Sequence, residues 1–216
     1  MCSPASAQAL ADLTTLGRVR LSEHFFMREM LYSEVGNLHG VPNIPEDAEA
    51  AVHAGTKLCT LLLEPLKAAF GHVSIRSAYR SPRLNGFCHE LHNQGVADSW
   101  CVCNEETYAH HIWDRRDAAG HLGAAATVFI PSYLDYYERT RDWQALGWWI
   151  RDHLEHFEQV QFFPSLAAFN IRWYEGPNAR SVGYLDADQR LRLTAAGEPN
   201  FDGDHRAHYA HVLHNR

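Results

Sequence analysis

The chain has 216 residues, of which 46% are hydrophobic and 12% aromatic, and its formal net charge is −7. This length suffices for one well-buried core, and the composition is that of a globular protein rather than a disordered one. The acidic balance argues against partners that are nucleic acids or anionic membranes, and no apolar run reaches the roughly 18 residues of a membrane span. We therefore expect a single domain over residues 1–216, with no nucleic acid and no membrane as partner.

The N-terminus and the cysteines indicate the compartment. Residues 1–8 have no basic flank and no long apolar stretch, so they do not resemble a secretory signal. Cysteine occurs five times, an odd number, at scattered positions, so a disulfide framework is not expected. We predict a cytoplasmic protein. The cysteines are Cys2, Cys59, Cys88, Cys101 and Cys103.

Two segments have the pattern of helices. Pro45 is followed by acidic residues that suit the first turn of a helix, apolar residues then recur at helical spacing as far as Ala69, and Gly71 ends the pattern. A second amphipathic run covers residues 143–154. Its Trp148-Trp149 pair is expected either to pack inside the protein or to form the face of a homodimer.

Strand-like segments follow the first helix. They cover residues 73–77, 125–130, 159–163, 169–173 and 180–184. Helices early in the chain, strands later and one helix between them predict an α+β domain, with an antiparallel sheet and helices packed on one side. Residues 1–20 and 203–216 are expected to be peripheral, the latter as a loosely held tail.

The connection between residues 79 and 117 is long, appears irregular and is rich in polar side chains, which is typical of a functional loop. A metal site is one interpretation. The pair Cys101 and Cys103 has one intervening residue, which does not fit a zinc knuckle. The neighbours His110 and His111 would diverge on a helix, whereas His111 and Asp114, three residues apart, could converge.

A site for an organic substrate is the second interpretation of this connection. Arg80 follows the strand 73–77, where its guanidinium could hold a carboxylate through two parallel hydrogen bonds or could bond loop carbonyls. Glu105 is the best carboxylate for general acid/base work, provided that it is partly buried with a raised pKa. It could also simply open a helix. Nearby aromatic residues suit a flat aromatic substrate, although such residues usually fill cores. They are Trp100, Trp113, Phe129, Phe162 and Trp173.

Residues 21–31, 62–66 and 75–85 together resemble the D-alanyl-D-alanine carboxypeptidases, zinc peptidases that share their fold with the Hedgehog signalling domain. This resemblance implies the same fold. However, Thr127 stands where the family has an aspartate ligand, and Ile171 or Arg172 stands where it has a histidine. Catalytic zinc needs three protein ligands. We therefore expect no metal in the family's position and a different chemistry on the scaffold.

The spacing of Arg80 and Glu105 resembles that of bacterial Pictet-Spengler enzymes, which condense tryptophan with a 2-oxo aldehyde or 2-oxo acid to a β-carboline in secondary metabolism. The resemblance implies that Glu105 is the general acid/base and that Arg80 anchors a carboxylate. His89 or His92 would border the aldehyde pocket. Thr127, Trp113 and Trp173 would line the substrate groove. The partners would be small molecules, tryptophan and an oxo compound. No nucleotide or flavin motif is visible, which fits a reaction without cofactors.

Two alternative functions remain open from the sequence. The first is a zinc peptidase or amidase with relocated ligands, such as His111, Asp114 and His121. The second is a catalytically inactive module whose groove binds a peptide or a cell-wall fragment. Metal analysis would test the first alternative, and product formation from tryptophan would exclude the second.

Overall fold

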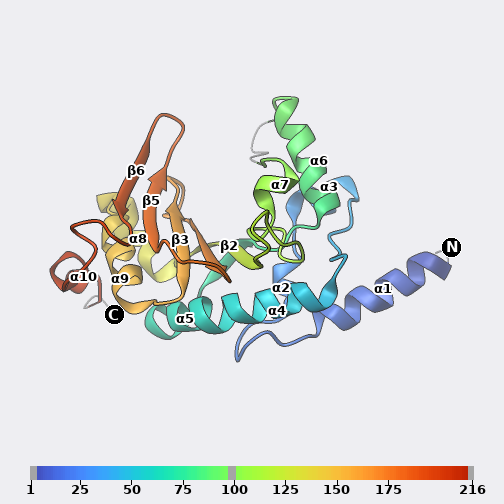
Figure 1. Ribbon diagram of the computed structural model, residues 1–216, viewed down its shortest axis with the longest axis horizontal. Helices are drawn as coiled ribbons and strands as arrows, with labels where there is room; N and C mark the ends of the chain where they lie inside the picture. The colour runs from blue at the N-terminus through green and yellow to red at the C-terminus, as the bar shows by residue number, and fades with distance from the viewer. Residues whose placement is uncertain (1–3, 97–100, 214–216) are drawn as a thin grey trace.

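A computed structural model describes residues 4–96 and 101–213 of the chain. One six-stranded sheet with the strand order β1-β2-β4-β3-β5-β6 forms the centre (Figure 1). All neighbouring strands are antiparallel except β3 and β5, which are parallel. The strands are β1 (Ser74–Ser77), β2 (Gly123–Phe129), β3 (Phe157–Phe162), β4 (Phe169–Tyr174), β5 (Ser181–Leu185) and β6 (Arg190–Thr194). The prediction of an α+β fold is confirmed, and the predicted antiparallel sheet is mostly antiparallel, with β3 and β5 as its one parallel pair.

The helices lie before, between and after the strands. In Figure 1 the first helix projects from the body of the protein, and its last turn lies beside the second helix. The helices are α1 (Pro4–Gly17), α2 (Met27–Met30), α3 (Glu34–His39), α4 (Ala48–Leu58), the π-helix η1 (Cys59–Leu63), α5 (Glu64–Phe70), α6 (Pro82–Asn93), α7 (Asn104–Thr107), α8 (Pro131–Thr140), α9 (Gln144–His153) and α10 (Arg206–Leu213).

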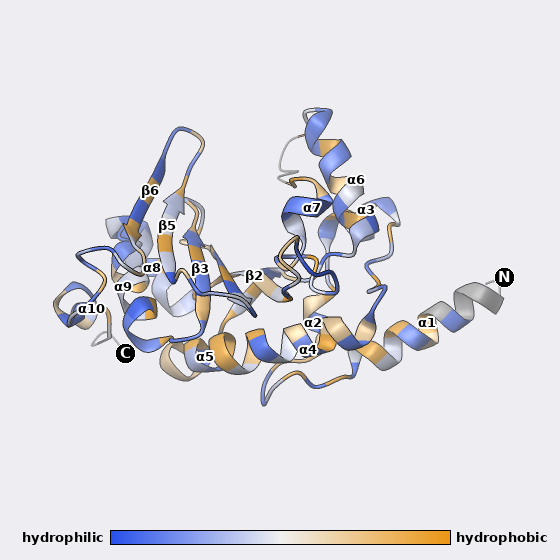
Figure 2. Cartoon of the chain, in the orientation of Figure 1, coloured by the Kyte–Doolittle hydropathy of each residue, from blue (hydrophilic) through white to orange (hydrophobic). Residues whose placement is uncertain are grey.

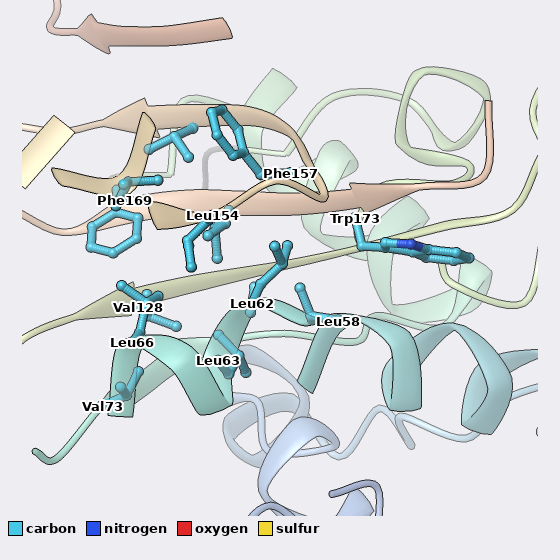
Figure 3. Packing of buried hydrophobic residues seen from close by; sticks show 14 of the residues in the cluster. Leu58, Leu62, Leu63, Leu66, Val73, Val128, Leu154, Phe157, Phe169 and Trp173 are labelled. Carbon is cyan, nitrogen blue, oxygen red and sulfur yellow. The ribbon is translucent and has the colours of Figure 1, made fainter. Parts of the chain in front are cut away.

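The predicted helix after Pro45 is present as the continuous run α4, η1 and α5. Asp47 caps its start by accepting a hydrogen bond from the backbone of Ala50, and Gly71 ends it with a φ of 82°. The π-helical turn ends just before Pro65, which has no backbone N–H to donate. The apolar side of this run lies against the sheet, and Figure 3 shows Leu58, Leu62 and Leu66 pointing toward it.

Alternation along the strands gives the sheet two different faces. In β4, Phe169, Ile171 and Trp173 are buried in the core with the helices (Figure 3). Asn170 and Arg172, which alternate with them, are half-buried. The same alternation in β2 places the side chain of Thr127 on one face of the sheet and those of the buried Ala126 and Val128 on the other face. The sheet therefore has an apolar face under α4, α5 and α9 and a polar face on the other side.

Several elements were not expected, among them α6, α7 and β6. The connection 79–117 is not irregular throughout, because it contains α6 and α7. Ser81 caps α6 by accepting a hydrogen bond from the backbone of Leu84, and Pro82 occupies its first turn. The sixth strand, β6, lies at the edge of the sheet, and much of it is exposed.

The prediction of a loosely held C-terminal tail is wrong for the described part of this segment. The ring of His205 stacks on Trp148 with 4.1 Å between centroids, and the hydroxyl of Tyr209 donates to Asp152 at 3.0 Å. α10 packs against α9, as Figure 1 shows. Trp148 and Trp149 are only 6% and 5% exposed, so the chain itself covers the surface that we had considered for a homodimer.

We expect the docking of α10 to weaken in acid. Burial alone would raise the pKa of Asp152, but hydrogen bonds from His205, Arg151 and Tyr209 hold this pKa below the ordinary value of an aspartate. A lowered pKa contributes stability above the unfolded-state pKa, and that stability is lost as the pH falls through the folded-state pKa. The melting temperature of the wild type should therefore fall between about pH 5 and pH 2 by more than that of Asp152→Asn.

The matched control for this experiment is Asp135→Asn, because Asp135 is exposed on α8. This variant should follow the wild-type pH profile. Equal acid sensitivity of Asp152→Asn and the wild type, measured by circular dichroism, would contradict the prediction.

Candidate active site

A hydrogen-bonded pair of side chains marks the centre of the polar face. Thr127 of β2 lies directly opposite Asn170 of β4, and its hydroxyl donates to Asn170 Oδ1 at 2.5 Å. Asn170, and neither Ile171 nor Arg172, therefore occupies the position beside Thr127. Ile171 is fully buried in the core. The strict alternation of Phe169, Ile171 and Trp173 in the sequence could have revealed this arrangement.

Two histidines lie next to this pair. His110 and His111 belong to a tight turn that follows Ala109, a residue with a φ of 53°. They lie in a turn and not on the helix that we assumed, and their ring centroids are 4.8 Å apart. His111 is buried, its Nδ1 lies 2.7 Å from the carbonyl oxygen of Ala78, and it also hydrogen-bonds the side chain of Asn170.

The pKa of His110 is lowered by burial and by two nearby arginines. Its carbonyl accepts a hydrogen bond from the backbone of Ala125 on β2, which fixes the turn on the sheet. Burial, together with the positive charges of Arg172 and Arg80, lowers the pKa of His110 to about 3. Burial, again with the charge of Arg80, also lowers the pKa of His111. Both imidazoles are therefore neutral near pH 7.

Arg80 lies in the segment that follows β1, next to His111. Its backbone N–H donates to the carbonyl of His111 at 2.8 Å. Its guanidinium Nη1 lies 2.8 Å from Cys101 Sγ, while its Nε is buried without a hydrogen-bond partner. Burial lowers the pKa of Arg80 to about 10. Within residues 4–96 and 101–213 no carboxylate forms an ion pair with Arg80, so the described part of the chain leaves its positive charge poorly compensated.

A second arginine lies two residues beyond Asn170 on β4. Arg172 donates from Nε to the carbonyl of Ala109 at 2.8 Å and from Nη1 to Glu158 Oε2 at 3.2 Å. Its guanidinium also lies over the ring of Tyr174. Burial raises the pKa of Glu158, against the opposing effect of Arg172. Sequence reasoning missed Glu158, because the pairing of β3 with β4 cannot be inferred from either strand alone.

These residues make up one polar cluster, which we define as Arg80, His110, His111, Thr127, Asn170, Arg172 and Glu158. Six of its seven members keep part of their surface exposed, and His111 is buried. The cluster combines two guanidiniums, two neutral imidazoles and one carboxylate. Guanidiniums bind carboxylates strongly when few other partners compete. The arrangement therefore suits an organic anion, with proton-transfer groups close by.

The predicted aromatic lining is mostly absent from the polar face. Trp113 is fully buried, donates from Nε1 to the carbonyl of Ala125 and packs edge-on against Tyr79. Trp173 points into the core face of the sheet (Figure 3). Neither tryptophan lines the polar cluster. Phe129 is half-buried, and Trp100 lies outside the described residues.

The remaining predicted residues lie around α6 and α7. Glu105 is exposed in the first turn of α7, so the condition of partial burial that we set for its acid/base role is not met in this structure. His92 is exposed near the end of α6. His89 is half-buried, and its Nδ1 lies 2.9 Å from the carbonyl oxygen of Cys101. Because Cys101 also contacts Arg80, one residue connects His89 with the polar cluster.

Cys101 forms a disulfide with Cys88 of α6, with 5.7 Å between their Cα atoms. The sequence had led us to expect no disulfide framework, so this bond is a correction. The spacing of Cys88 and Cys101 in the sequence did not indicate a bond, because α6, which carries Cys88, was not anticipated. Cys59 and Cys103 are free thiols.

The three residues of the relocated-ligand alternative do not converge. Asp114 accepts hydrogen bonds from the hydroxyl of Tyr79 and from the backbone at the start of α4, and it is buried there. His111 faces Ala78, and His121 faces the hydroxyl of Tyr174. In the described part of the chain, no group of three His, Cys, Asp or Glu side chains is placed to share a metal ion.

Comparison with known proteins adds no further assignment. No protein-family model, curated protein or solved structure matches the chain. Among the described residues, no helix combines the length and the apolar character that crossing a membrane requires.

Proposed function

We propose that the chain is a Pictet-Spengler enzyme that condenses L-tryptophan with a 2-oxo aldehyde or 2-oxo acid to a β-carboline. One observation carries the proposal, namely the poorly compensated guanidinium of Arg80 beside two neutral imidazoles. A buried cation without an ionic partner becomes more stable when a substrate carboxylate arrives. The spacing of Arg80 and Glu105, which resembles that of known enzymes of this class, specifies the reaction.

We also propose that the scaffold is related to the D-alanyl-D-alanine carboxypeptidase and Hedgehog fold. Thr127, Asn170 and His111 meet at one point of the sheet, and they are connected by hydrogen bonds. A zinc peptidase would need ionic or imidazole ligands at such a point, whereas a hydroxyl and an amide are poor zinc ligands. This replacement supports a scaffold with new chemistry.

The proposed reaction consists of addition, dehydration and ring closure. The amine of tryptophan attacks the carbonyl carbon, and loss of water gives an iminium ion. The indole carbon then attacks the iminium carbon, and a proton leaves the ring to restore aromaticity. These steps move only protons and water, so they need no cofactor, and their product is a tetrahydro-β-carboline. The aromatic, fluorescent β-carboline forms from this product when dioxygen oxidises the new ring. One positioned carboxylate can transfer the protons, which contributes about 10²- to 10⁴-fold.

Arg80 and Glu105 have separate roles in this proposal. Arg80 holds the carboxylate of tryptophan, and Glu105 transfers protons once the aromatic substrate covers it. Glu105 lies four residues after Cys101, the residue that contacts Arg80. Substrate that covers an exposed carboxylate removes water from it and brings it into contact with the reacting atoms. Glu158 is the carboxylate of the polar cluster itself, where it pairs with Arg172.

The test of the proposal is the binding of L-tryptophan in comparison with tryptamine, which lacks the carboxylate. Arg80→Met should weaken L-tryptophan binding about 100-fold, because two charge-assisted hydrogen bonds contribute roughly 3 kcal/mol. Tryptamine binding should not change. Equilibrium dialysis measures both affinities, and the fluorescence of the β-carboline formed with methylglyoxal measures the reaction.

The matched control is Arg83→Met, since Arg83 is an exposed arginine of α6. It should bind L-tryptophan as the wild type does. Equal binding of L-tryptophan and tryptamine to the wild type would contradict the proposed role of Arg80. Carboxylate-dependent binding without any product would instead support the inactive binding module.

A further inference from the structure

The disulfide touches the side chain on which the proposed substrate binding depends. Cys101 Sγ is bonded to Cys88 and lies 2.8 Å from Arg80 Nη1. Cys101 is buried, so water does not separate the two groups. The covalent state of this sulfur must therefore affect the electrostatic surroundings of the guanidinium.

The two covalent states of Cys101 differ in charge. A disulfide sulfur is neutral and only a weak hydrogen-bond acceptor, so it leaves the charge of Arg80 almost uncompensated. A free thiol beside a guanidinium loses its proton readily, because the cation stabilises the thiolate. The thiolate would form an ion pair with Arg80. A substrate carboxylate would then have to compete with an anion that is already in place.

Cys101 is also held in position without the disulfide. The side chain of His89 contacts its carbonyl oxygen at 2.9 Å, and Asn85 Nδ2 donates to the carbonyl of Val102 at 3.0 Å. Asn85 also bonds the side chain of Asn104. These contacts join residues 101–104 to α6. Reduction would therefore leave the Cys101 sulfur beside Arg80.

We propose that Cys101 is a positioning residue for Arg80 and that its disulfide with Cys88 keeps the guanidinium available for a carboxylate. The inference rests on the carboxylate-binding role proposed for Arg80. A dithiol reductant breaks the S–S bond and supplies two electrons and two protons, while it is itself oxidised to a cyclic disulfide. Both cysteines become thiols, the Cys101 thiol gives its proton to solvent, and the resulting thiolate pairs with Arg80.

Two single substitutions test this inference, because both remove the disulfide and only one leaves a thiol beside Arg80. Cys88→Ser retains the Cys101 thiol, whereas Cys101→Ser replaces it with a neutral hydroxyl. Equilibrium dialysis should show that Cys88→Ser binds L-tryptophan at least about tenfold more weakly than Cys101→Ser. Dithiothreitol should weaken binding to the wild type and leave both variants unaffected. Tryptamine binding should not respond to dithiothreitol.

Equal affinities of the two variants for L-tryptophan would overturn the inference, because the disulfide would then act only as a structural bond. Melting temperatures of both variants show whether they lose the same stability.

A second measurement is independent of substrate binding, namely the ultraviolet absorbance of the thiolate as a function of pH. Cys88→Ser should retain a thiolate to lower pH than Cys88→Ser combined with Arg80→Met. Identical titrations would overturn the inference even if tryptophan proved not to be the substrate. Failure of the wild type to prefer L-tryptophan over tryptamine would instead count against the proposed function.

Discussion

Replacing Glu105 with glutamine is expected to lower the rate of β-carboline formation by about 10²-fold or more and to leave the affinity for L-tryptophan unchanged. Glutamine has nearly the size of glutamate but cannot take up and release the protons of iminium formation and rearomatisation. Glu105 is exposed on α7, so the change should not affect folding. Initial rates from product fluorescence and affinities from equilibrium dialysis separate the two effects.

Two further variants make this experiment decisive. Glu106→Gln is the matched control, because Glu106 is exposed in the same turn of α7, and it should retain the wild-type rate. Glu158→Gln tests the other carboxylate, which is half-buried and paired with Arg172. If Glu158→Gln lost turnover and Glu105→Gln retained it, the proton transfer would have to be assigned to Glu158.

Gly123→Ala is expected to destabilise the protein by about 3 kcal/mol or more, which makes it the most damaging small substitution that we anticipate. A Cβ atom at this position would overlap with the carbonyl oxygen of Ala109 and would lie 3.0 Å from that of Trp173. Both obstacles are backbone atoms, which cannot move aside as a flexible side chain can. The turn with His110 would have to separate from β2. Urea denaturation measures the free energy of unfolding.

The control applies the same substitution to a different backbone environment. Gly86 lies inside α6, where a Cβ atom would make only ordinary contacts with Asn104. Gly86→Ala should stabilise the protein by about 0.5–1 kcal/mol, because alanine is the better helix former. A free energy of unfolding for Gly123→Ala within about 0.5 kcal/mol of the wild type would show that the turn at Ala109 can relax.

Local patterns predicted most of the fold because they reflect burial directly. The run from Pro45 to Gly71 carries its own start and stop signals, and five strands were recognised from alternating apolar residues. The strand β6 was missed although Arg190, Leu191, Arg192 and Leu193 alternate between polar and apolar residues, and as an exposed edge strand it buries little. The helix α6 was missed although Ser81-Pro82 is a start signal, because polar residues dominate the segment.

The candidate site was only partly predictable, because its geometry depends on pairings between distant segments. Arg80 was identified from the turn after β1, and it belongs to the polar cluster, where its backbone contacts His111. Asn170, Arg172 and Glu158 acquire their positions from the register of β2, β4 and β3, which no single segment specifies. The two adjacent histidines were misjudged because a turn with a positive φ at Ala109 was taken for a helix.

The π-helical turn η1 has a consequence for insertions and deletions. An α-helix advances about 100° per residue, so a π-helical turn contains one residue more than the α-helical path needs. Deleting one residue between Cys59 and Leu63 would therefore restore a regular α-helix and would turn α5 only slightly relative to α4. Leu66 and Phe70 would still face the sheet. Sequences one residue shorter in this segment should therefore keep the same apolar stripe after Pro65.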